Sequence, residues 1–112
     1  MGEAWFKAFP DELARLLVDA RMCADVCEAH LDDPTLEPDG LRRAVHALAA
    51  PAAISRLLIE LIDQPAEVVL AAVRLCRDLT GAAAAESSLP AEVAAALRAA
   101  SASAAELLDA TG

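Results

Sequence analysis

Apolar positions recur along the chain at alternating spacings of three and four residues, in four separate stretches. This spacing puts one apolar side chain per turn on a single face of an α-helix, and we refer to each such row as a seam. The seam positions, in chain order, are Leu13, Leu16, Ala20, Cys23, Cys27 and His30; Leu41, Ala44, Leu48, Pro51, Ser55, Leu58 and Ile62; Ala66, Val69, Val73, Cys76, Thr80, Ala83 and Ser87; and Val93, Leu97, Ala100, Ala104 and Leu107. The pattern predicts four amphipathic helices.

Prolines mark the boundaries of these helices. Pro10, Pro65 and Pro90 stand where the first, third and fourth helices begin, and the proline- and glycine-containing stretch 32–40 forms the only long connection. We predict helices over about 10–31, 41–62, 65–87 and 90–109, with Asp39 capping the second. The two short connections favour antiparallel neighbours, so the fold class is all-α: an up-down-up-down antiparallel four-helix bundle. Pro51 is expected to kink the second helix.

The chain is organised as a single bundle over residues 10–112, preceded by an aromatic N-terminal arm, residues 1–9. The composition agrees with a helical protein, because 29 of the 112 residues are alanine, 17 are leucine and none is tyrosine. The seams are filled by small side chains and include three cysteines, two serines and a threonine. A core of this kind contains few large residues and depends on many small contacts.

A net charge of −9 excludes several classes of partner. An acidic surface repels phosphate backbones and anionic lipid, so we expect neither nucleic acid nor membrane binding. The sequence contains no apolar run long enough to span a membrane and no signal peptide, so we expect a cytoplasmic protein. In that compartment the three cysteines would stay reduced.

The cysteines are the candidate metal ligands. Cys23 and Cys27 are one turn apart on the same helix face, and Cys76 falls at a similar height on the parallel third helix. We therefore expect Cys23 and Cys76 to approach across the core, where the thiols suit a soft ion such as Cu(I). The alternative is that cysteine acts simply as a small buried hydrophobe. His30, one turn beyond Cys27, is either a fourth ligand or a histidine favoured by the helix dipole.

No catalytic constellation is visible, and we expect a protein that is not an enzyme. One further motif, His46-Ala47-Leu48-Ala49-Ala50, resembles the His-x-Leu-Lys-Gly run of histidine phosphotransfer domains but lacks the lysine and the glycine. Arg42 and Arg43 precede His46 within about one turn and can replace the missing lysine.

The layout of the chain resembles the Cys-rich four-helix copper-binding bundles, which include the bacterial copper storage proteins. The run from Cys23 through Cys27 to His30 is similar to the family's CxxxCxxC, with histidine in place of the last cysteine. Pro51 to Ser55 corresponds to a CxxxC that has lost both cysteines, and Val73 to Thr80 to a CxxCxxxC that keeps only Cys76. The resemblance implies a cysteine-depleted member with at most a small Cu(I) site. A metal-free interaction or small apolar-ligand module is the alternative.

All three aromatic residues lie in the N-terminal arm, at Trp5, Phe6 and Phe9. They support two interpretations. Either they close the open end of the bundle as a hydrophobic staple, or they form the contact of a homodimer.

Overall fold

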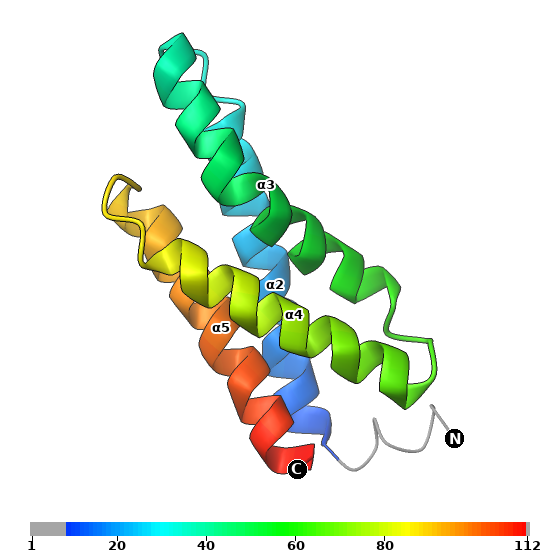
Figure 1. Cartoon of the computed structure of the whole chain (residues 1–112). Coiled ribbons are helices and arrows are strands. Elements are labelled where there is room, and N and C mark those ends of the chain that lie inside the picture. The colour runs from blue at the N-terminus through cyan, green and yellow to red at the C-terminus, as the bar shows by residue number, and fades with distance from the viewer. Residues whose placement is uncertain (1–8, 112) are drawn as a thin grey trace.

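The computed structural model describes residues 9–111, and these residues form four α-helices joined by short loops (Figure 1). The helices are α2 (Pro10–Leu31), α3 (Pro38–Glu60), α4 (Ala66–Ala84) and α5 (Ala91–Thr111). No strand occurs within this part of the chain. Each helix packs antiparallel to the next, and α5 returns to pack against α2. The predicted all-α four-helix bundle is therefore confirmed.

Two helix boundaries differ by three residues from those expected, the others by two at most, and each of the larger differences has a local cause. The second predicted helix begins at Pro38 instead of Leu41, since proline suits the first position of a helix. Asp39 consequently lies in the first turn of α3 and does not cap it. Helix α4 ends at Ala84, so Ser87, predicted to lie on a seam, is exposed in the following loop.

The core consists of two apolar clusters, one towards each end of the bundle. The termini-end cluster includes Leu16, Leu58, Val73, Cys76 and Leu107. The opposite-end cluster includes Cys23, Cys27, Leu48, Val93 and Leu97, packed with alanines. These side chains are buried because they occupy the inward face of each helix, as the seam pattern predicts.

Helix α3 continues through Pro51, which is buried. Figure 1 shows α3 changing direction midway along its length. A proline ring clashes with the carbonyl one turn earlier and cannot donate a backbone hydrogen bond, so a bend is the expected response.

The N-terminal arm is described only from Phe9, so Trp5 and Phe6 lie outside the described residues. The Phe9 ring is partly buried against the termini-end cluster. The backbone carbonyl of Phe9 accepts a hydrogen bond from Leu13 N at 3.0 Å, in the first turn of α2. Phe9 thus covers the end of the bundle, and the dimer interpretation of the arm stays a prediction.

Candidate functional site

Cys23 and Cys27 point from α2 into the bundle and are fully buried. Their spacing of one turn brings the two side chains into contact, and both belong to the opposite-end cluster. Alanine and leucine side chains surround them, so the two thiols form a polar pair within an apolar environment.

Cys76 reaches the core from α4 and is also fully buried, but it packs in the termini-end cluster. Its backbone carbonyl accepts a hydrogen bond from Thr80 Oγ1 at 2.6 Å. Cys76 and Cys23 lie near enough for their charges to interact, which places the third thiol beside the boundary between the two clusters.

Ser55 of α3 lies between the two groups of thiols, next to both Cys23 and Cys76. The side chain is completely buried, and its Oγ has no hydrogen-bond partner. An unpartnered buried hydroxyl is costly, because it loses its bonds to water without replacing them. Ser55 is therefore a polar group available to the thiols at the centre of the bundle.

The contact between the two cysteines of α2 makes them titrate as a pair. The Cys27 thiol lowers the pKa of Cys23 against the opposing effect of burial. The Ser55 hydroxyl, which has no other partner, lowers it further because it can donate a hydrogen bond to the ionised thiol. The pKa of Cys27 is correspondingly raised, by Cys23 first and by burial second. The pair therefore releases its first proton more readily than its second.

Cys76 behaves differently, since it has no thiol partner of this kind. Burial raises its pKa to about 11, and the neighbouring Ser55 hydroxyl opposes that rise. This thiol is protonated and unreactive at neutral pH.

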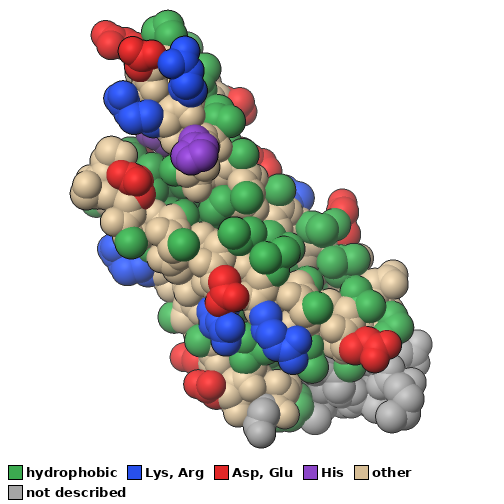
Figure 2. Space-filling model, in the orientation of Figure 1, with side chains coloured by type: hydrophobic (Ala, Val, Ile, Leu, Met, Phe, Trp, Pro, Cys, Tyr) green, Lys and Arg blue, Asp and Glu red, His purple; other side chains and the backbone are tan. Residues whose placement is uncertain are grey.

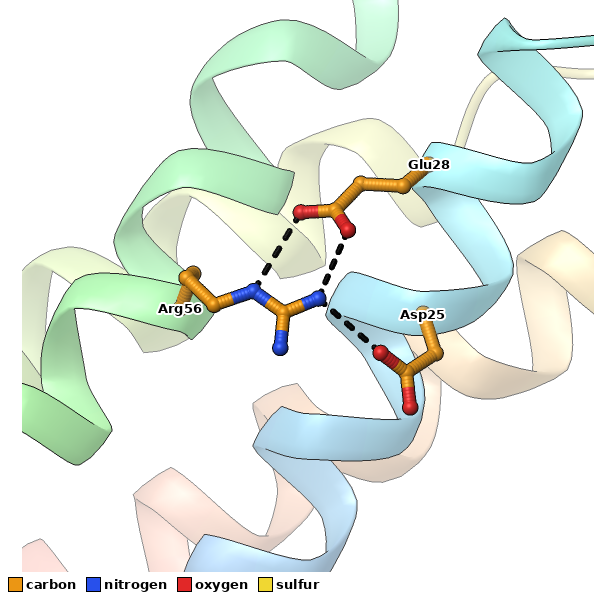
Figure 3. A network of polar contacts seen from close by, with 3 residues as sticks. All are labelled: Asp25, Glu28 and Arg56. Atoms are coloured by element: carbon orange, nitrogen blue, oxygen red, sulfur yellow. Dashed lines mark hydrogen bonds and ion pairs between the residues drawn. The ribbon is translucent and has the colours of Figure 1, made fainter.

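An ion-pair network joins α2 and α3 (Figure 3). Arg56 Nη2 lies 2.6 Å from Glu28 Oε1 and 2.9 Å from Asp25 Oδ1, and Arg56 Nε donates to Glu28 Oε2 at 3.3 Å. Asp25 and Glu28 flank Cys27, and Arg56 follows Ser55. The network therefore fixes the relative height of Ser55 and the two cysteines of α2.

His30 is half-buried in the last turn of α2. It lines a surface hollow of about 180 Å³ together with Leu36, Arg43 and Ser88. Within residues 9–111, no group of three or more His, Cys, Asp or Glu side chains is arranged to hold a metal ion. The structure thus brings together Cys23 and Cys27, and it does not assemble a set that includes His30.

His46 is exposed on α3 and lines a hollow with Arg42 and Arg43. These are the two conditions that the phosphotransfer interpretation requires. The lysine and glycine of that motif have no substitutes among the residues that follow His46.

Sequence reasoning located the thiols and Ser55 but missed the Arg56 network. A spacing of three between Asp25 and Glu28 indicates one helix face, yet no signal in the sequence connects that face to Arg56.

No protein-family model matches the chain, and comparison with curated proteins and with solved structures finds no significant match to either.

Proposed function

We propose that this four-helix bundle binds a single soft metal ion, Cu(I), through the thiols of Cys23 and Cys27, and that it is not an enzyme. The observation that carries the proposal is the buried contact between these two thiols, next to the unpartnered hydroxyl of Ser55. Cu(I) prefers thiolate ligands, and a pair of thiolates meets its minimum requirement.

The donor set fits Cu(I) better than other metals. Structural zinc takes four ligands in a tetrahedron, and the described residues offer no group of even three. Cys76, which also neighbours Ser55, is the third buried thiol and would supplement the pair. With only three cysteines in the chain, the protein would not be a high-capacity store.

The resemblance to the copper-binding bundles supports the same proposal at the level of layout. The four helices follow the order that the family would require, and no helix within residues 9–111 is long and apolar enough to cross a membrane. The relation to that family is itself part of the proposal.

An anaerobic titration with Cu(I) in competition with a chromophoric chelator tests the proposal. We expect the wild type to withdraw about one ion per chain, with release of protons as thiols ionise. Cys23→Ala and Cys27→Ala should each abolish competition, whereas Cys76→Ala should weaken it and leave the stoichiometry unchanged. Ala24→Ser, a buried change beside the pair, serves as the control.

Failure of the folded wild type to compete would contradict the proposal. Equal loss in all three cysteine variants would instead show that Cys76 belongs to the primary ligand set, as the sequence analysis expected. Circular dichroism of each variant distinguishes loss of binding from loss of fold.

Phosphotransfer through His46 is a second candidate, favoured by the exposure of His46 and its two neighbouring arginines. Transfer of label from a phosphorylated receiver domain to the wild type, and its absence in His46→Gln, would establish that activity. Absence of transfer to the wild type would exclude it.

A further inference from the structure

A groove runs between α3 and α4 and changes character along its length. At one end, a hollow of about 320 Å³ is lined by Arg42, Arg43 and His46. It continues into a second hollow of about 260 Å³, lined by Ala50, Pro51, Leu79 and Ala82. His46, Ala47 and Glu86 line both hollows, so the two form one continuous surface, which we call the α3–α4 groove.

The groove exists because α3 and α4 make the least extensive contact of the four neighbouring helix pairs. Alanine side chains on both helices leave the space between them unfilled. The bend of α3 lies at this position, since Pro51 lines the apolar end.

The basic end of the groove contrasts with the net charge of −9 of the chain. Arg43 makes no ion pair with any residue of the described range 9–111, and Arg42 pairs only with the exposed Asp39, at 3.3 Å. Glu86 is the one acidic side chain lining either hollow, and its carboxylate accepts a hydrogen bond from Ser88 Oγ at 3.2 Å. In Figure 2, basic side chains lie next to a histidine near one end of the molecule, with acidic side chains beside them at the tip, and hydrophobic side chains continue along the same face.

We propose that the α3–α4 groove binds a medium-chain alkyl carboxylate. The carboxylate would pair with Arg43 and Arg42, and the hydrocarbon would lie over Ala50, Pro51 and Leu79. Charge complementarity selects an anionic head group, because arginine pairs with carboxylate through two parallel hydrogen bonds. The ten residues from Arg42 to Pro51 span about 14 Å of helix, a length that suits a ligand such as decanoate. This site is separate from the thiols and does not depend on the proposed binding of Cu(I).

Titration of the isotope-labelled full-length chain with decanoate, followed by NMR, tests the proposal. We expect saturable shifts at residues lining both hollows, with weaker binding of decanol and of hexanoate. Arg43→Glu should weaken decanoate binding about tenfold or more, because it replaces the attraction by repulsion. Arg98→Glu on α5 makes the same charge change at an exposed site outside the groove, and should leave the affinity unchanged.

The apolar end has its own pair of variants. Ala50→Leu should fill the groove and reduce binding, whereas Ala102→Leu, at an exposed position on α5, should not. The proposal is overturned if decanoate causes no saturable shifts, or if Arg43→Glu and Arg98→Glu weaken binding equally. The proposal is also overturned if inorganic phosphate binds as tightly as decanoate. Binding of an acidic amphipathic peptide, with no binding of decanoate, would overturn it as well.

Discussion

Ser55 is the core residue whose chemistry fits its surroundings least, because its buried hydroxyl has no hydrogen-bond partner. The other buried hydroxyls of the described residues are paired. Thr80 Oγ1 donates to the Cys76 carbonyl at 2.6 Å, and Ser103 donates to Asp19. A helix position that tolerates such a cost, beside the thiols of Cys23 and Cys76, is a candidate for a role in binding at that point.

Ser55→Ala should therefore raise the free energy of unfolding by about 1 kcal/mol, since it removes an unpartnered polar group and introduces a better helix former. Urea unfolding of the metal-free protein measures the change. Ser103→Ala is the control, and it should lower stability by about 1 kcal/mol because it leaves Asp19 without its donor. A loss of stability in Ser55→Ala would show that the hydroxyl is bonded to a thiol.

Cys76 makes stability depend on pH in the alkaline range. Burial raises the pKa of Cys76 from 9.0 to about 11 in the folded protein. The full contribution of this thiol to the free energy of unfolding is therefore present below pH 9. Between these values the unfolded chain loses the proton and the folded chain retains it. The free energy of unfolding should then fall by about 2 kcal/mol as pH rises to 11.

Urea unfolding curves recorded at intervals of about half a pH unit between pH 8 and pH 11 measure the slope of the free energy of unfolding against pH. The chain contains no tyrosine and Lys7 is its only lysine, so thiols dominate the titration there. Cys76→Ala should have a shallower slope than the wild type. Val73→Ala, which removes bulk from the same cluster and keeps the thiol, should have the wild-type slope. Identical slopes in Cys76→Ala and the wild type would contradict the assignment.

At the scale of elements, the contact between α2 and α3 combines apolar packing with a single polar network. Arg56 binds Asp25 and Glu28 across the helix pair, but all three side chains remain about half-exposed to water. Ion pairs of this exposure contribute little to stability, since solvent screens them. The network acts mainly by selecting one relative height of the two helices.

Arg56→Met should lower the free energy of unfolding by less than about 1 kcal/mol at low ionic strength, and the difference from wild type should shrink in concentrated salt. Arg77→Met is the matched control, because the Arg77 side chain pairs with its chain neighbour Asp78 and makes no ion pair with another helix within residues 9–111. Its effect should be smaller. If Arg56→Met also weakens Cu(I) competition, the height of α3 matters for the thiols, and an unchanged affinity would separate the network from the site.

The whole molecule carries 18 acidic against nine basic residues, so the folded state repels itself electrostatically. Added sodium chloride should raise the free energy of unfolding by about 1 kcal/mol as it screens that repulsion. This effect has the opposite sign to the effect of salt on the Arg56 network. Urea unfolding at low and high ionic strength measures it.

Glu60→Gln combined with Asp63→Asn offers a matched comparison. Both acids are exposed at the C-terminal end of α3, where the helix dipole disfavours negative charge. The double variant should be more stable than wild type at low salt and should gain less from added salt. A salt response equal to that of the wild type would contradict self-repulsion as its origin.

The four helices and most of the residues that they bury could be predicted from the sequence alone. Helix formation depends on neighbours within one turn, so the periodicity of the seams and the prolines between them were sufficient. The errors fell at helix ends, at Pro38 and Ser87, where competing start and stop signals lie within a few residues. The burial of Cys23, Cys27 and Cys76 followed from the same periodicity.

Which side chains of different helices come together could be seen only in the folded structure. The proximity of Ser55 to two thiols, the Arg56 network and the α3–α4 groove all depend on the rotation and height of one helix relative to another. A shift of one turn moves a side chain by about 5.4 Å along its helix, which is enough to make or break such contacts. No local pattern records that shift, because it is set by the packing of all four helices together.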